Sequence, residues 1–242
     1  MTRITVLNPN TSGALTDTIV AAAQVVSGRG VTVTGANPAV GVPSVESHAE
    51  EAVAAVGVLD LVRRHQAQTD AFVVACFGDT GVAAAREVAT CPVVGMTEAA
   101  LQTACLVAHR FVVVTMPART VAHSERVVRA LGLEHRCSVV AVDEPVAGLV
   151  GGSAHLLDAF AEAAHTATAT HGSEAVVLGC AGLADLAGPL SRAVGQPVID
   201  GVAAAVGIAS GLVAMGLNTS RANTFAAVPG LPPFGPTEGD RS

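Results

Sequence analysis

Two cysteines of this chain stand in the same local setting, 104 positions apart. Cys76 ends the apolar run AFVVAC, which is followed by a glycine-containing turn (FGDTG) and then by an alanine-rich helical pattern. Cys180 ends the similar run AVVLGC. A thiol between a strand and a helix N-terminus is biased toward thiolate, because unpaired N–H groups and the helix dipole favour negative charge there. Each cysteine is a candidate acid, base or nucleophile, and the alternative is a small buried core residue.

Two opposed thiols suit the inversion of a carbon stereocentre that bears an acidic proton. One group must remove the proton from one face while another delivers a proton to the other face. A thiolate and a thiol can do this, and which cysteine acts as the base depends on the enantiomer of the substrate. The enolate formed between the two steps needs hydrogen-bond donors, such as backbone N–H groups at the two turns. We therefore predict Cys76 and Cys180 as the catalytic pair. The predicted substrate-binding residues are Asn10, Phe77, Gly78, Asp79, Thr115, Ala181 and Gly182.

The composition excludes several classes of mechanism and partner. The sequence contains no lysine, which rules out an internal Schiff base with pyridoxal phosphate, lysine aldolase chemistry and a Walker-type P-loop. The formal net charge is −7, there is no Trp or Tyr, and no basic cluster is present, so a nucleic acid is not an expected partner. A small neutral or modestly polar molecule is the expected ligand.

The remaining cysteines and the histidines do not predict a disulfide framework or a metal site. The five cysteines include no CxxC pair, and Cys91, Cys105 and Cys137 are interpreted as core or incidental thiols. The eight histidines show no HExxH-like spacing, so no metal and no other cofactor is predicted. His48 lies near the presumed cleft and is expected to be a solvated helix-start residue. The opening residues have no features of an export signal, which together with the free thiols predicts a cytoplasmic protein.

The elements that must position the two thiols alternate between strand and helix. Apolar β-rich runs at 2–7, 31–35, 71–75 and 92–95 are separated by helical patterns, and the same order begins again at 111–115, 138–142, 175–179 and 197–200. The repeat extends to the residues, since VVACFG corresponds to VLGCAG and PVVG to PVID. Such alternation predicts parallel sheets with right-handed crossovers. The predicted fold is α/β, with two similar four-stranded parallel-sheet halves related by a pseudo-twofold axis and the active site between them.

The predicted domains are residues 1–96 plus 197–217 for the first half, 97–196 for the second half, and an irregular Pro/Gly-rich tail at 218–242. The apolar stretch 197–217 is interpreted as a buried closing helix of the first half rather than a membrane span, because it contains Asp200 and is rich in Ala and Gly. Ligands of open α/β sheets bind outside the carboxyl ends of the strands. Asn10 and Thr115 lie at two such ends, although either residue can instead serve a turn or a helix cap.

The stretches VLNPNTS, GVPSVESHAEEA, VVACFGDTGVAAARE, PVVGMTEAA and VVLGCAGLADL resemble the hydantoin racemase family of the aspartate/glutamate racemase superfamily. The resemblance covers roughly residues 3–216. It implies cofactor-independent racemisation at C5 of 5-substituted hydantoins or of allantoin, with Cys76 and Cys180 as the two bases, in a homo-oligomer. Amino-acid racemases of the superfamily have CNT and GCTE-like motifs where this chain has CFGD and GCAG. The difference favours a neutral cyclic ureide over an α-amino acid.

Two alternatives remain at the level of the sequence. Relatives in the superfamily use one such cysteine to decarboxylate arylmalonates or to isomerise maleate. Those substrates are dianions, for which the loops ACFGD and GCAGL offer few cationic or hydroxyl groups. The other alternative is a noncatalytic ligand-binding protein, which would not need a thiol in each half.

Overall fold

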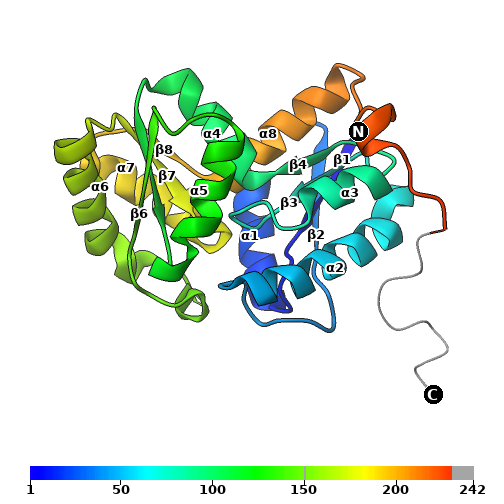
Figure 1. Cartoon of the computed structure of the whole chain (residues 1–242), viewed down its shortest axis with the longest axis horizontal. Coiled ribbons are helices and arrows are strands. Elements are labelled where there is room, and N and C mark those ends of the chain that lie inside the picture. The colour runs from blue at the N-terminus through cyan, green and yellow to red at the C-terminus, as the bar shows by residue number, and fades with distance from the viewer. Residues whose placement is uncertain (150, 231–242) are drawn as a thin grey trace.

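The computed structural model describes residues 1–149 and 151–230, and it forms two lobes, each built on a four-stranded parallel sheet (Figure 1). The strand orders are β2-β1-β3-β4 and β6-β5-β7-β8, so the second sheet repeats the topology of the first. The first sheet contains β1 (Thr2–Leu7), β2 (Val31–Ala36), β3 (Ala71–Val74) and β4 (Val93–Gly95). The second contains β5 (Phe111–Thr115), β6 (Cys137–Ala141), β7 (Ala175–Gly179) and β8 (Val198–Ile199). The predicted α/β fold with two parallel-sheet halves is confirmed.

Helices connect the strands as the alternating pattern predicts. The α-helices of the described residues are α1 (Gly13–Val26), α2 (His48–His65), α3 (Val82–Val88), α4 (Met96–Val107), α5 (Val121–Ala130), α6 (Leu157–His171), α7 (Ala187–Val194) and α8 (Gly201–Ala214). The helix expected directly after Gly182 begins later. A 3-10 helix, η5 (Ala181–Leu186), comes first, so the second thiol is followed by a tighter turn than a regular α-helix provides.

The central strands and the helix starts follow from local physical chemistry. Every residue of β3 (AFVV) and β5 (FVVVT) is buried, as expected for β-branched and aromatic side chains in parallel sheets whose two faces are both covered by helices. Helix α2 begins with a capping box, in which the Ser47 hydroxyl accepts the Glu50 N–H and the Glu50 carboxylate accepts the Glu46 N–H. This cap sets where α2 begins, beside the cleft between the lobes.

Helix α8 packs in the first lobe although it follows the last strand of the second (Figure 1). Its residues Val202, Ala205 and Val206 belong to the same apolar cluster as Ile4 and Val6 of β1. The chain thus crosses between the lobes twice, which ties them together. Among the described residues, no helix is both long and apolar enough to cross a bilayer.

The described part of the C-terminal tail runs along the first lobe. Residues 218–230 contain one short 3-10 turn, η6 (Asn223–Phe225). The Asn218 amide donates to the Thr90 carbonyl at 2.8 Å, and the Arg221 guanidinium donates to the carbonyls of Arg86 and Glu87. The rest of the predicted tail, 231–242, lies outside the described residues.

Candidate active site

A cavity of about 40 Å³ lies between the two lobes, at the carboxyl ends of β1, β3, β5 and β7. Both Cys76 and Cys180 line it. The carboxyl ends of parallel strands in the two sheets meet there, as expected for ligand sites of open α/β sheets. The other lining residues are Asn8, Pro9, Asn10, Leu15, Val45, Ala75, Phe77, Thr115, Met116, Thr120, Val146, Gly179 and Ala181.

The turn after Cys76 is sharp and is held from outside the cavity. Gly78 has a φ of +103° and Asp79 a φ of 54°, so the chain reverses within two residues. The Asp79 carboxylate accepts the backbone N–H groups of Thr97 at 2.8 Å and Glu98 at 2.9 Å, which are the first orphan donors of α4. The Gly78 N–H donates to the Thr97 hydroxyl at 2.7 Å. Helix α4 therefore fixes the turn that presents the first thiol.

These contacts already use the N–H groups of two of the predicted substrate-binding residues. The N–H groups of Gly78 and Asp79 were expected to stabilise an enolate, but the first donates to Thr97 and the second to the Cys76 carbonyl at 3.1 Å. Neither residue is among those that line the cavity. The physical reason is the helix N-terminus of α4, whose unpaired N–H groups draw the Asp79 carboxylate away from the cleft.

Burial dominates the ionisation of Cys76. Removal from water raises the pKa of this thiol to about 12, and the nearby Cys180, Asp79 and Glu51 act in the same direction. The opposing contribution is the Thr80 hydroxyl, which donates to the Cys76 sulfur at 3.3 Å. The contact with Thr80 was not predicted from the sequence. The spacing of four residues between Cys76 and Thr80 is the feature that indicates it, because the tight turn brings the Thr80 side chain back to the thiol.

Cys180 is half-buried, like Cys76, but has different neighbours. Burial raises the pKa of its thiol to about 11, opposed by a hydrogen bond from the Gly182 N–H at the start of η5. The expected bias of both cysteines toward thiolate is therefore wrong for the free enzyme. The helix-start N–H groups are present, but the loss of hydration outweighs them.

Polar side chains from both halves line the cavity alongside the thiols. The Asn10 Oδ1 accepts the Asn8 amide and the Ser12 N–H, each at 2.9 Å. The NH₂ group of Asn10 is thereby left as the donor that a ligand can use. Thr115 lies in the cavity wall of the second half, where its hydroxyl contacts the hydroxyl of Thr120 at 3.0 Å.

The other expected binding residues fall into two groups. Phe77 and Ala181 line the cavity, next to the two thiols. Gly182 does not line it, and acts on the site through its N–H, which faces the Cys180 sulfur. Binding of substrate by Asn10, Phe77, Thr115 and Ala181 stays a prediction. Among the described residues, those that line the cavity include no Asp, Glu, Arg or His, so this part of the wall carries no fixed charge apart from that of an ionised thiol.

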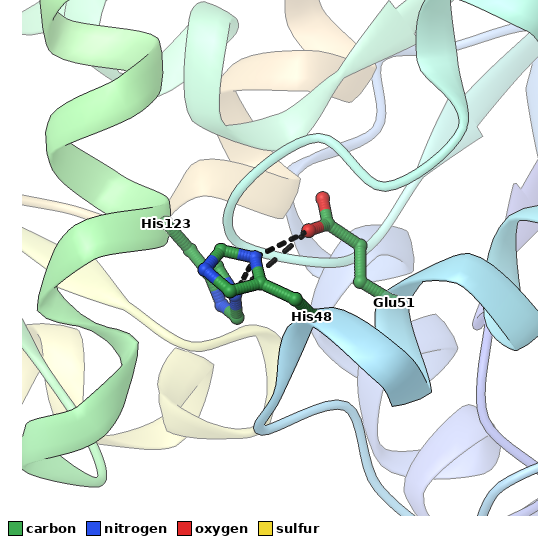
Figure 2. A group of neighbouring side chains, drawn as sticks. All are labelled: His48, Glu51 and His123. Carbon is green, nitrogen blue, oxygen red and sulfur yellow. Dashed lines mark hydrogen bonds and ion pairs between the residues drawn. The ribbon is translucent and has the colours of Figure 1, made fainter.

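A second polar cluster bridges the lobes just outside the cavity (Figure 2). His48 and Glu51 project from α2, and His123 projects from α5 of the other lobe. Burial is the main cause that lowers the pKa of His123, whereas His48 is exposed at the helix start as expected. The sequence analysis missed this grouping. The i,i+3 spacing of His48 and Glu51 was visible, but His123 lies 75 residues further along the chain than His48.

Residues 4–209 match the family model described as Asp/Glu/Hydantoin racemase. A hydantoin racemase of Rhizobium meliloti is 40% identical over 225 residues, which cover 92% of this chain and 93% of that protein.

Two solved structures also share nearly the whole fold. The allantoin racemase from Klebsiella pneumoniae has a TM-score of 0.90 at 44% identity, with 94% of each chain covered. The allantoin racemase from Pseudomonas fluorescens has a TM-score of 0.91 at 37% identity, covering 95% of this chain and 98% of that one.

Proposed function

Because this chain belongs to the Asp/Glu/hydantoin racemase family and is a racemase, we propose that it inverts C5 of a neutral cyclic ureide, a 5-substituted hydantoin or allantoin, by two-cysteine proton transfer. The single observation that carries this proposal is the presence of two thiols, one from each lobe, in one cavity without charged side chains. The hydantoin and allantoin racemases named above support the substrate class. Both compounds contain the same five-membered ring, so the ring is the shared element that the cavity has to recognise.

The proposed reaction moves one proton on each face of the ring. The thiolate of one cysteine takes the C5 proton, the C–H electron pair becomes the enolate of the adjacent ring carbonyl, and the other cysteine gives its S–H proton to the opposite face. The first sulfur ends as a thiol and the second as a thiolate, so the pair is ready for the substrate of opposite hand. No electron leaves or enters, which is why no cofactor is proposed.

Donors on the cavity wall would stabilise the developing enolate. The NH₂ group of Asn10 and the N–H of Ala181, at the start of η5, lie in the two halves of the wall. The Thr115 hydroxyl donates to the Gly179 carbonyl and the Thr120 hydroxyl to the Pro117 carbonyl, so these two groups hold the wall of the second lobe and add no free donor. Fixed donors in a site closed to water are effective for charge that develops in a transition state.

The absence of charged groups from the lining supports a neutral substrate over a dicarboxylate. Decarboxylation of an arylmalonate or isomerisation of maleate would bring two carboxylates beside an already anionic thiolate. Neutralising them would need arginine side chains or additional donors, and no arginine lines the cavity. These activities remain the alternative within the same superfamily.

Substrate would enter the cleft between the two lobes, where the cavity is partly open to solvent. Closure of the lobes over the ring would exclude water from the thiolate. The boundaries 1–96 plus 197–217 and 97–196 are proposed for the two moving bodies. A cytoplasmic location and a homo-oligomeric state are likewise part of the proposal.

The decisive test follows solvent exchange and optical rotation together. Single enantiomers of 5-alkyl and 5-aryl hydantoins and of allantoin are incubated with the protein in D₂O with a chelator present. Decay of rotation to zero with deuterium at C5 supports the proposal and identifies the substituent. Unchanged rotation for every ureide, with turnover of arylmalonate or maleate, would establish the alternative.

A further inference from the structure

We propose that His48, Glu51 and His123 bind a divalent zinc-type metal ion that joins the two lobes beside the cleft. The three ligand atoms come from facing helices, His48 and Glu51 from α2 and His123 from α5 (Figure 2). This site is separate from the cysteine pair, and the proposal does not depend on the racemase reaction.

The spacing of the ligand atoms fits one small ion. The His48 Nδ1 lies 3.0 Å from the His123 Nε2 and 3.6 Å from the Glu51 Oε2. The His123 Nε2 and the Glu51 Oε2 are 3.8 Å apart. Three points with these separations lie on a circle of about 2.0 Å radius, so an ion at its centre meets all three at the Zn–N and Zn–O bond length of about 2.0–2.2 Å. Such an ion lies in the plane of the three atoms, and tetrahedral coordination with a water ligand would need small shifts of the three side chains.

The donor set selects the class of ion. Two imidazole nitrogens and one carboxylate oxygen suit zinc, cobalt, nickel and copper, whereas magnesium and calcium prefer sets made of oxygen. The His48 side chain is 74% exposed while that of His123 is 6% exposed. The site is therefore anchored on its inner side and open to water on its outer side, which leaves a position for a water ligand.

A neighbouring group holds the carboxylate in place. The Arg126 guanidinium on α5 donates to both oxygens of Glu51, and also to the Gly78 carbonyl at 3.0 Å. Each carboxylate oxygen has two lone pairs, so Oε2 can accept from Arg126 and still bind an ion. Hydrogen-bonded carboxylates of this kind are common around metal sites. Through Gly78, the same arginine connects the site to the turn that presents Cys76.

Calorimetric titration with zinc tests the proposal. Because thiolates also bind zinc, the titration is carried out on the full-length wild type and on the C76S/C180S protein, in which the cleft thiols are absent. One ion per chain is expected in the C76S/C180S background. Adding His48→Gln should weaken binding by at least about tenfold, since even partners beyond the ligands themselves contribute about 10- to 100-fold.

Variants and a second probe make the result decisive. His48 is exposed, so H48Q is expected to fold, and circular dichroism checks H123Q and E51Q. His165→Gln on the exposed face of α6 is the matched control and should bind zinc as its parent does. Cobalt should give the absorption of a nitrogen and oxygen site without thiolate charge transfer. Equal zinc affinity in H48Q and its parent, or no binding in millimolar zinc, would overturn the proposal.

Discussion

The two halves present their thiols from equivalent strand ends but surround them differently. In the first half, Cys76 is followed by a turn with three positive φ angles, and it receives a hydrogen bond from Thr80 while the half-buried Asp79 lies nearby. In the second half, Cys180 leads directly into the 3-10 helix η5, and a backbone N–H of Gly182 faces the sulfur. The position equivalent to Thr80 is Ala184, and that equivalent to Asp79 is Leu183. The two halves thus share the thiols and differ in the groups that control their ionisation.

The difference has a direct chemical consequence. Both pKa values are raised by burial, to about 12 for Cys76 and about 11 for Cys180. Carboxylates add to the effect of burial in both halves, Asp79 and Glu51 at Cys76 and Glu46 at Cys180. We infer that the free enzyme holds two thiols at neutral pH and that Cys180 is the easier of the two to ionise. The Thr80 hydroxyl in the first half and the Gly182 N–H in the second then have the same role, because each lowers the pKa of the neighbouring thiol.

Removal of either thiol should have the largest effect. Cys76→Ser and Cys180→Ser should each lower racemisation by about 10²- to 10⁴-fold, the usual contribution of a general acid or base, because a serine hydroxyl is far less acidic. Each variant should still exchange deuterium into the one enantiomer whose proton faces the remaining thiol, and the two variants should select opposite enantiomers. Proton NMR in D₂O measures this exchange. Racemisation within a few-fold of wild type in either variant would show that one thiol is enough.

Alkylation tests the ranking of the two thiols. The thiolate is the reactive form, so below both pKa values the rate of inactivation by iodoacetamide should rise about tenfold per pH unit between roughly pH 7 and 10. Peptide mapping should find Cys180 modified before Cys76, with bound substrate protecting both. The partly exposed Cys105 serves as the internal control, because its modification should leave activity intact. A flat pH dependence in this range would contradict the raised pKa values.

The sequence predicted the fold and the two thiols because those features are local and repeated. Strand and helix periodicities, and the correspondence between VVACFG and VLGCAG, are contained in short stretches. The direction of the pKa shifts was mispredicted because burial depends on both lobes closing over the thiols, which no short stretch encodes.

The contacts of Asp79 and His123 could not be predicted from the sequence for a similar reason. Asp79 reads as a turn residue aimed at a ligand, but its partners are the N–H groups of α4, 18 and 19 residues away. The grouping of His123 with His48 became visible only in the structure, where a residue of α5 contacts a residue of α2. Pairing across the lobes was the information that the sequence alone did not supply.

Removal of the Thr80 hydroxyl should weaken proton transfer by Cys76 in the first half and leave Cys180 in the second half unchanged. Thr80→Val keeps the shape of a fully buried side chain but removes the donor to the Cys76 sulfur. A hydrogen bond to a charged group contributes about 1.5–3 kcal/mol, so the pKa of Cys76 should rise further and kcat at neutral pH should fall by about 10- to 100-fold. The pH–rate profile should shift to higher pH. Thr80→Ser restores the hydroxyl and should recover most of the activity, whereas a loss that serine does not rescue would indicate a packing role.

Asp79 gives the first half a pH-dependent stability that Leu183 cannot give the second. Burial raises the pKa of Asp79 from its ordinary value of 3.8 to about 6, against the opposing hydrogen bonds from Glu98 and Thr97. The folded state therefore holds this proton more tightly than the unfolded state. The contribution of Asp79 to the free energy of unfolding is thus fully present below about pH 4 and is lost as the pH rises through 6, by roughly 2–3 kcal/mol.

In Asp79→Asn the pH-dependent part of this free energy disappears, although one N–H of α4 loses its acceptor. Urea unfolding followed by circular dichroism at pH 4 to 7 should show the wild type losing stability relative to D79N as the pH rises, while the exposed Asp158→Asn control stays parallel to wild type. Parallel curves for wild type and D79N would mean that the carboxylate is fully compensated by the N-terminus of α4, and that the two halves differ at their thiols but not in the turns that support them.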